Sequence, residues 1–299
     1  MKEIKDSITL NGKTYEAIQI DFNSYNVEED SINVGDNTYY ASKVEGLNEE
    51  KINVDKVFGN NSWKTISSVS AQIASQNMTA EQVETTYGWN IGDIKTETLS
   101  TGEEIQVRII DFNHDTLSND HSTKAGITMQ MVNCLATRYP INSSNTNKGG
   151  WGASKMRTET MPTIKATLSQ DLQNVIKLVD KKAANGGGSN YSATETLNDD
   201  LFLLAGVEIF GSKDGYGNAK DGANEGTQYA YWQGKTANDR IKKYDKNGDS
   251  ISETETYWWE RSSFYNLNQY FCAVGSTGEA KGDQAGSTYP RGVAFGFCV

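Results

Sequence analysis

The sequence is poor in cysteine, proline and histidine and has no long apolar run. Only three Cys and three Pro occur among its 299 residues, which excludes a disulfide framework and a proline-rich stalk. No apolar stretch reaches the length of a membrane span, and the first residues lack the apolar centre of a secretory signal. We therefore expect cytosolic synthesis without a signal peptide and no insertion into a membrane.

Basic residues are also in short supply. The chain has 28 Lys and Arg against 39 Asp and Glu, which gives a net charge of −11 and a pI near 4.8. Duplex nucleic acid is bound through a clustered basic face that neutralises phosphates. The charge balance therefore argues against a nucleic-acid partner, while 36% hydrophobic and 10% aromatic residues indicate a packed globular protein.

The few reactive side chains form no familiar catalytic motif. His114 and His121 stand in "DFNHDTLSNDH" with a spacing that fits no common zinc motif, and we expect His114 to be hydrogen-bonded in a polar loop after a strand. Each of Cys134, Cys272 and Cys298 lies among apolar neighbours, which favours burial. Alternatively, Cys272 and Cys298 could be neighbours on adjacent strands. No nucleophile elbow or glycine-rich nucleotide loop occurs.

One acidic loop has part of a calcium-binding pattern. In "DKNGDSISE", the candidate ligands at positions one, three, five and nine of such a loop are Asp245, Asn247, Asp249 and Glu253. Ser250 stands where the turn glycine belongs, and Thr256 where the bidentate Glu belongs. These departures favour a solvated acidic turn, so we expect no cofactor and retain calcium as the alternative.

Residues 1–56 are predicted to form a small β module. "SITLNGKTYEAIQIDF" alternates apolar and polar residues around Asn11-Gly12, the strongest short hairpin signal. "INVGDNTYYASKV" has a second turn at Gly35-Asp36. We expect this module to serve in attachment or oligomerisation.

Residues 57–299 alternate between helical and strand patterns, which predicts an α+β domain. Helices are expected in "WKTISSVSAQIASQ" and in "TAEQVETTYG", where Thr79 and Gln82 form a capping-box pattern. The β-branched residues of 103–113 predict a strand. The spacing of Ile127, Met131 and Leu135 predicts a further helix, and short strands are expected in "YWWERSS", "FCAV" and "GVAFGFCV".

Aromatic residues are concentrated in "WWERSSFYNLNQYFCAVGS", residues 258–276. A core strand would be richer in Val, Ile and Leu, whereas a solvated loop would carry fewer rings. We expect Trp258, Trp259, Phe271 and Phe297 to belong to the core. Tyrosines among Ser, Gly and Asn are also typical of adaptable binding surfaces.

The order of motifs from Trp63 onwards resembles an uncharacterised C-type-lectin-like domain family of Gram-positive gut bacteria and their phages. Its most specific part is "WWERSS", then "FCAV", then "GVAFGFCV". The resemblance covers about residues 63–299 and implies a C-type-lectin-like fold of the formylglycine-generating-enzyme type. Glu260 is a departure, because the resemblance implies an apolar residue after Trp258-Trp259.

The resemblance implies a binding face, because similar proteins include variable proteins that diversity-generating retroelements rewrite. Glu279, Lys281 and Gln284 are not residues that such rewriting of Asn-type codons produces. The implied ligand-binding positions, expected to be exposed, are Ser263, Tyr265, Asn268, Tyr270, Ser276, Asp283, Ser287 and Tyr289.

The resulting hypothesis is a non-enzymatic receptor-binding protein, acting in a phage or prophage tail tip or on an extracellular surface. Its expected partners are a bacterial cell-surface protein or glycan and other subunits of the assembly, including copies of itself. The alternatives are a formylglycine-generating-type oxidase, which would need Cys272 and Cys298 as a metal-binding pair, and a purely structural virion protein.

Overall fold

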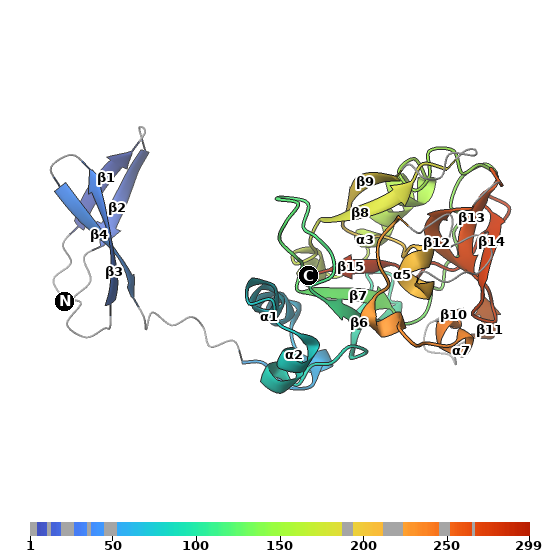
Figure 1. Ribbon diagram of the computed structural model, residues 1–299, viewed down its shortest axis with the longest axis horizontal. Helices are drawn as coiled ribbons and strands as arrows, with labels where there is room; N and C mark the ends of the chain where they lie inside the picture. Colours follow the sequence, from blue (N-terminus) through green and yellow to red (C-terminus); the bar gives the residue numbers. More distant parts are fainter. Residues whose placement is uncertain are drawn as a thin grey trace. The chain divides into compact units, whose positions relative to one another are not determined.

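The computed structural model describes residues 5–10, 13–18, 27–34, 37–44, 53–186, 194–211, 224–244, 252–264 and 267–299. The chain divides into two compact units, Met1–Asn53 and Val54–Val299 (Figure 1). The boundary lies three residues before the expected one. Asp55 explains the difference, because its backbone N–H donates to Asn61 (2.9 Å) and its carbonyl accepts from the Trp89 indole (2.9 Å).

Two antiparallel hairpins make up the described part of the first unit. β1 (Lys5–Leu10) pairs with β2 (Lys13–Ile18), and β3 (Val27–Val34) pairs with β4 (Asn37–Val44). Leu10 lies opposite Lys13 and Val34 opposite Asn37. Each connection is therefore two residues long, Asn11-Gly12 in the first hairpin and Gly35-Asp36 in the second, as predicted.

Two longer helices open the second unit where the sequence predicts them. α1 (Trp63–Ser75) begins after Ser62, whose hydroxyl accepts from the Thr65 N–H. α2 (Ala80–Tyr87) has the predicted capping box of Thr79 and Gln82, which satisfies two backbone donors at the helix start. The other helices are short: η2 (Phe58–Asn60), η3 (Met156–Thr160), α3 (Met161–Lys165), α4 (Gln170–Gln173), α5 (Gly206–Phe210), η4 (Ala230–Trp232) and α7 (Ala237–Arg240).

A four-stranded antiparallel sheet of order β15-β7-β6-β5 forms the centre of this unit. Its strands are β5 (Ile94–Thr98), β6 (Glu104–Phe112), β7 (Ile127–Met131) and β15 (Gly296–Cys298). The helix predicted around Ile127 is wrong, because the segment is β7. All five residues of β7 are buried. The sequence of β7, ITMQM, alternates apolar and polar residues, which is the strand pattern. The helical spacing of Ile127, Met131 and Leu135 is incidental, because Leu135 lies beyond the end of the strand.

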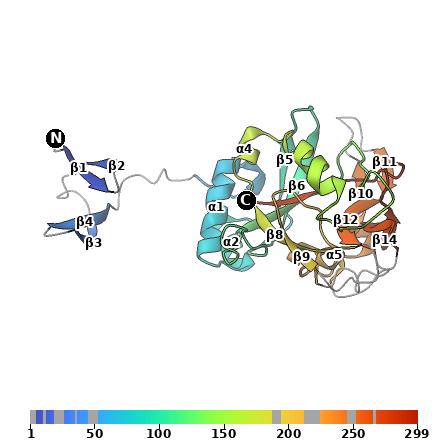
Figure 2. The same ribbon diagram turned by 90° about the horizontal axis from the view of Figure 1, so that it is seen from above.

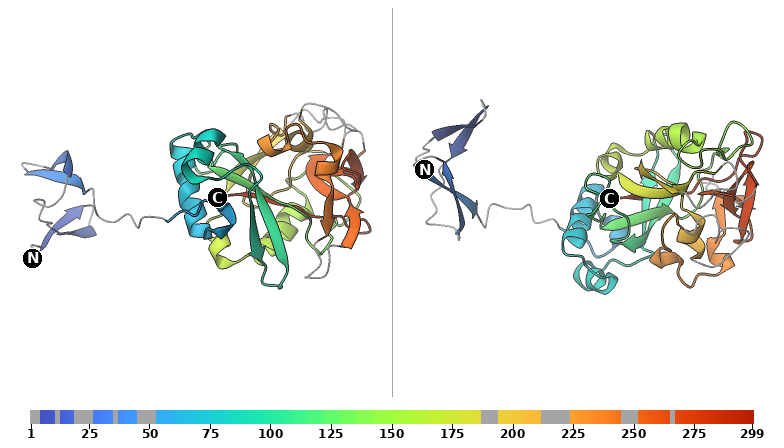
Figure 3. Two further views of the ribbon diagram at one scale, coloured as in Figure 1. Left: turned by 90° about the horizontal axis from the view of Figure 1, so that it is seen from below. Right: turned by 45° about the horizontal axis from the view of Figure 1, so that its top comes forward.

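A second sheet lies on the opposite side of the unit from α1 and α2 (Figure 3). It has the order β12-β13-β14, formed by Trp258–Ser263, Tyr270–Val274 and Ala280–Gln284. Two separate hairpins complete the β structure, β8 (Val179–Ala184) with β9 (Thr194–Asp199) and β10 (Lys242–Tyr244) with β11 (Ser252–Thr256). The unit is therefore α+β, with several antiparallel sheets and few helices, as the sequence predicts at that level.

The core joins α1 to the C-terminal strand and fills the space between the sheets. The rings of Trp63 and Phe297 lie 6.0 Å apart, and Figure 2 shows α1 beside the end of the chain. Trp258 and Trp259 are fully buried, as predicted, and their indole N–H groups donate to the carbonyls of Arg240 (3.0 Å) and Tyr139 (2.8 Å). Buried indoles thus keep their hydrogen bonds.

All three cysteines are buried, as their apolar neighbours predict. Cys272 lies on β13 and Cys298 on β15, which belong to different sheets. The alternative that these two residues are neighbours on adjacent strands is therefore wrong. Burial raises the pKa of the Cys298 thiol well above its usual value, which disfavours its thiolate form.

Candidate functional site

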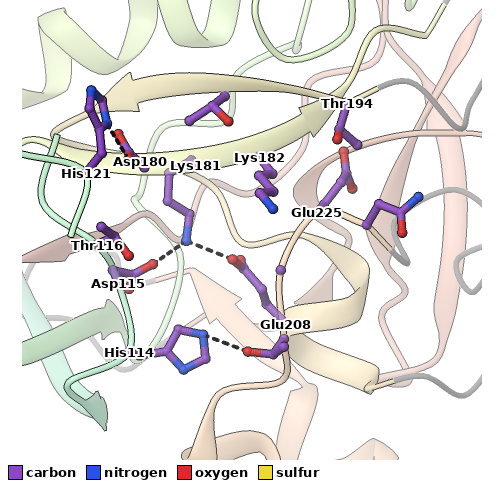
Figure 4. A pocket seen from close by; sticks show the side chains of 14 residues that line it. His114, Asp115, Thr116, His121, Asp180, Lys181, Lys182, Thr194, Glu208 and Glu225 are labelled. Carbon is purple, nitrogen blue, oxygen red and sulfur yellow. Dashed lines mark hydrogen bonds and ion pairs between the residues drawn. The ribbon is translucent and has the colours of Figure 1, made fainter. Parts of the chain in front are cut away.

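The second unit contains a polar cavity of about 700 Å³ (Figure 4). Its walls come from the loop after β6, the β8–β9 hairpin, α5 and residues 224–227. The side chains that line it include His114, Asp115, Asp180, Lys181, Lys182 and Glu225. Small-molecule sites commonly have volumes of about 300–1,000 Å³, so the cavity is large enough to hold a ligand.

The outer edge of β8 explains how the hairpin is fixed at this place. On this edge, backbone groups of residues 180, 182 and 184 point away from β9 and are hydrogen-bonded to other segments. The Asp180 N–H donates to the Thr116 carbonyl (2.8 Å), and the Lys182 carbonyl accepts from Arg261 Nε (3.0 Å). The Ala184 N–H donates to Glu225 Oε1 (2.7 Å). Because an exposed strand edge pairs readily with other chains, these contacts both position and protect β8.

Lys181 lies at the floor of the cavity and is buried. Its ammonium donates to Asp115 Oδ1 (2.7 Å), to Glu208 Oε1 (2.7 Å) and to the Tyr229 hydroxyl (2.8 Å). An ammonium has three N–H groups, so all three are used. Figure 4 shows the side chain reaching from β8 between the two carboxylates.

Arg261 of β12 is the second buried cation of this network. It meets Glu208 with two nitrogens, Nη1 to Oε2 (2.5 Å) and Nη2 to Oε1 (2.8 Å), and also donates to the carbonyls of Leu203 and Glu225. Glu208 Oε2 in turn accepts from the Ala205 N–H (2.9 Å) at the start of α5. Such bidentate pairing is the strong form of an Arg–carboxylate contact.

The two carboxylates of the network remain charged despite their burial. Burial raises the pKa of Asp115, but the charge of Lys181 and the hydrogen bonds of Lys181 and Thr128 outweigh it and hold the pKa well below its usual range. For Glu208, burial is outweighed by the charges of Arg261 and Lys181, so its pKa is also lowered. Asp115, Glu208, Lys181 and Arg261 thus form a neutral set of two anions and two cations.

Glu225 and Glu260 lie next to this set and behave differently. Burial raises the pKa of Glu225, although its carboxylate accepts from the Ala184 N–H and the Ser262 hydroxyl. Glu260 is fully buried, and neither of its carboxyl oxygens has a hydrogen-bond partner in the described part of the chain. Burial, and then repulsion by Glu225, raises the pKa of Glu260 well above its usual value. Burial therefore disfavours the charged form of both groups.

His114 closes the inner end of the cavity, in the loop after β6 and hydrogen-bonded as predicted. Its Nδ1 lies 2.8 Å from Asp111 Oδ2, its Nε2 lies 3.4 Å from the Thr227 hydroxyl, and its ring is 4.2 Å from the Tyr229 ring. Burial lowers its pKa, but the hydrogen bond to the Asp111 carboxylate and the charges of Asp115, Asp111 and Glu208 raise it more. The imidazole is thus a structural member of the wall.

The charged floor of the cavity is saturated with its own contacts. Lys181, Arg261, Asp115 and Glu208 have partners on each side, so a ligand would meet a rigid surface without having to reorganise it. This arrangement suits binding by hydrogen bonds, because preorganised polar groups lose little entropy when a ligand arrives.

The implied ligand-binding residues fall into three groups. Asn268 and Ser287 are exposed, and Tyr270, Asp283 and Tyr289 are partly exposed. The sheet register brings these five towards one end of the β13–β14 pair, since Tyr270 lies opposite Gln284 and the Asn268 carbonyl accepts from the Asn147 N–H. Asp283 is also held by Arg291 Nε at 2.5 Å.

Two of the implied positions are not exposed at this end of the sheet. The expectation that Ser263 is exposed is wrong: the residue is fully buried in β12, whose six residues are all buried. Ser276 is partly exposed, but it lies in the turn between β13 and β14 at their other end. β13 has five residues, which separates the two ends by roughly 17 Å. Tyr265 lies outside the described residues.

Most of the candidate calcium ligands lie outside the described residues. These are Asp245, Asn247 and Asp249, and only the backbone of Glu253, in β11, is described. Elsewhere in the described ranges, no group of three or more His, Cys, Asp or Glu residues is arranged to hold a metal ion. No helix in the described part of the chain combines the length and apolar character that crossing a membrane requires.

The cavity floor was not predicted from the sequence. The available signal was a charged residue inside an apolar run: Glu208 in "LFLLAGVEIFG" and Arg261 in "YWWERSS". Charged side chains are almost never fully buried unless they are paired. Two such residues of opposite sign therefore indicate a buried ion pair, although not its location next to a cavity.

Comparison with known proteins gives one match. No curated protein and no solved structure matches the chain. One family model, described as Domain of unknown function (DUF6273), matches residues 25–293. The matched range includes most of the large unit and part of the first, far more than half of the sequence. The chain therefore belongs to this family, the Domain of unknown function (DUF6273) family.

Proposed function

We propose that the protein is a non-enzymatic ligand-binding protein whose second unit has a C-type-lectin-like fold of the formylglycine-generating-enzyme type. The proposal starts from the resemblance of residues 63–299, with "WWERSS", "FCAV" and "GVAFGFCV" as its most specific parts. The placement of these three motifs as β12, β13 and β15 among antiparallel sheets is compatible with such a fold.

The observation that carries the proposal is the end of the β13–β14 pair. Asn268, Tyr270, Ser287 and Tyr289 present polar and aromatic side chains there, from β13 and from the segments that precede β13 and follow β14. β13 pairs with the fully buried β12. Recognition commonly uses such residues held on a rigid scaffold, because tyrosine supplies contact area at a low entropic cost. We call these four residues the sheet-end face.

The proposed partner of the sheet-end face is a protein or glycan of a bacterial cell surface. In this proposal the protein acts in a phage or prophage tail tip or on an extracellular surface, and the sheet-end face varies between related copies. The hairpins of the first unit would attach the protein to its assembly or join it to further copies of itself.

The oxidase alternative loses support from the cysteines. An oxidase of the formylglycine-generating type would need a metal-binding cysteine pair that substrate can reach. Cys272 and Cys298 are buried on different sheets, and burial disfavours their thiolate forms. The other alternative, a purely structural virion protein, differs from the proposed binding protein because it would bury the sheet-end face against another subunit.

Cell binding tests the proposal directly. Purified wild-type protein, the double variant Tyr270→Ala/Tyr289→Ala and the control Ser276→Ala would be incubated with intact Gram-positive gut bacteria, after circular dichroism has shown that all three fold. We expect the double variant to lose at least about tenfold in bound protein, because interface tyrosines commonly contribute more than 1 kcal/mol each. The Ser276 variant should bind like the wild type, because its residue lies at the other end of the strands.

Equal binding by the double variant and the wild type would contradict the proposed face. Failure of the wild type to bind any strain would favour a structural role, and size-exclusion chromatography would then be expected to show an oligomer that the double variant disrupts.

A further inference from the structure

We propose that the cavity beside the β8–β9 hairpin is a second ligand site, and that it binds a hydroxyl-rich ligand of the saccharide class. This site is distinct from the sheet-end face and uses other residues. The cavity walls have hydrogen-bonding groups without partners among the described residues, whereas the charged groups of the floor are all paired.

The hairpin places four polar side chains along the cavity. Lys182 lies opposite Thr196, and Ala184 lies opposite Thr194, in the antiparallel register of β8 and β9. Asp180 and Lys182 are two residues apart on one strand, so their side chains emerge on the same face, about 7 Å apart. All four polar residues line the cavity, and Figure 4 shows Asp180, Lys182 and Thr194 on this hairpin.

Asp180 is an acceptor with one oxygen still open. Its Oδ2 receives His121 Nδ1 at 2.7 Å. Its Oδ1 is buried and has no hydrogen-bond partner within the described ranges. A buried carboxylate oxygen without a donor is unfavourable, so a ligand donor that reaches it would be stabilising.

Lys182 is a donor with all its N–H groups open. Its side chain is exposed, and it makes no hydrogen bond or ion pair with any residue that the structure describes. It differs in this respect from its neighbour Lys181, whose ammonium is fully used by Asp115, Glu208 and Tyr229. Lys182 is therefore the cation at the cavity that a ligand can recruit.

An open acceptor and an open donor side by side select the chemistry of the ligand. A simple carboxylate would satisfy Lys182 but would be repelled by Asp180, and a simple amine would have the opposite difficulty. A hydroxyl both donates and accepts, so neighbouring hydroxyls on one ring can donate to Asp180 Oδ1 and accept from Lys182 Nζ. The hydroxyls of Thr194 and Thr196 extend the same pattern along the hairpin.

The floor of the cavity fits a ligand without net charge. Asp115, Glu208, Lys181 and Arg261 balance one another, and burial raises the pKa of Glu225. At the rim, Asp180 and Lys182 have opposite charges. The positive and negative charges around the cavity thus largely cancel, whereas a site for an anion or a cation would have an excess of one sign.

Saturation-transfer NMR with free sugars tests the proposal. The probes are D-glucose, D-galactose, N-acetyl-D-glucosamine and the sugar alcohol ribitol at millimolar concentration, with sodium acetate and methylammonium chloride as probes that carry a single function. The proteins are the wild type, Lys182→Ala, Asp180→Asn and the control Lys177→Ala, which removes another exposed lysine. Urea unfolding verifies that each variant is folded.

We expect at least one hydroxyl-rich probe to bind the wild type, and Lys182→Ala and Asp180→Asn each to weaken that binding about tenfold, as for the loss of one charge-assisted hydrogen bond. Lys177→Ala should bind like the wild type, and the two single-function probes should not bind. The variant Tyr270→Ala/Tyr289→Ala should retain this binding, which separates the cavity from the sheet-end face.

Three outcomes would overturn the proposal. One is the absence of saturation transfer from all four hydroxyl-rich probes. Another is sugar binding that neither hairpin variant weakens, because the site would then lie elsewhere. The third is equally strong binding of acetate or methylammonium, which would make the cavity an ion site.

Discussion

The cavity floor and the sheet-end face use polar residues in opposite ways. At the floor, Lys181, Arg261, Asp115 and Glu208 are buried and fully paired, and they join β8, β12, α5 and the loop after β6. At the sheet-end face, Asn268 and Ser287 are exposed, in the turn before β13 and the turn after β14. Polar side chains thus stabilise the fold in one region and are exposed to solvent in the other.

Arg261→Met is the change that should separate the two regions most. It would leave Glu208 with Lys181 as its remaining cation and would remove the donors to three backbone carbonyls. Breaking one partner of a buried ion pair commonly costs about 3–5 kcal/mol. We expect a loss of that size in the free energy of unfolding, measured by urea titration.

Lys182→Met supplies the matched control for this change. It removes an exposed lysine from β8 and should alter stability by no more than about 0.5 kcal/mol. If Arg261→Met lost equally little, the network would not stabilise the fold in the way we describe.

Glu260→Leu should give an intermediate effect of opposite sign. Glu260 is buried next to Glu225 and Arg261, and neither of its carboxyl oxygens has a hydrogen-bond partner among the described residues. Its pKa is raised. Its protonated form contributes stability fully below about pH 4, near the pKa of an unfolded Glu, and that contribution is lost as pH rises towards the folded pKa. Relative to wild type, the variant should gain about 1–2 kcal/mol at pH 8 and less at pH 5.

The pH dependence of this difference identifies its cause. Urea titrations at pH 5 and pH 8 on Glu260→Leu, Glu260→Gln and wild type would separate titration from packing, because neither variant titrates at this position. A gain for Glu260→Leu that is equal at both pH values would show that packing, rather than the carboxyl group, accounts for it.

Asn268→Ala/Ser287→Ala should have the smallest effect on stability. Both side chains are exposed, and surface substitutions of this kind usually change the free energy of unfolding by less than about 0.5 kcal/mol each. Thermal unfolding measures this directly. A loss above about 2 kcal/mol would mean that the sheet-end face supports the fold and would remove its contrast with the cavity floor.

Local signals explain which parts of the fold could be predicted. The capping box of Thr79 and Gln82 and the pairing of the strands on either side of Asn11-Gly12 involve residues close in sequence, and both predictions are confirmed. For β7, the spacing of Ile127, Met131 and Leu135 predicted a helix, although the five residues of the strand alternate apolar and polar. A spacing that runs past the end of an element can therefore hide the correct pattern inside it.

The cavity floor is different, because its partners are far apart in the sequence. Lys181 meets Asp115 across 66 positions and Glu208 across 27, and Arg261 meets Glu208 across 53. No local pattern specifies such pairings. The burial of Ser263 was missed for a related reason, since its neighbours in β12 resemble those of an exposed strand until the rest of the unit covers them.

The position of β15 has a consequence for folding during synthesis. β7 is buried along its length and takes its second neighbour from β15, with Thr128 meeting Cys298 across 170 positions. On the ribosome, β7 therefore keeps one open edge until β15 emerges. Open strand edges invite pairing with other chains, so nascent chains that stop before β15 should be prone to aggregate, and late folding of the large unit follows from its topology.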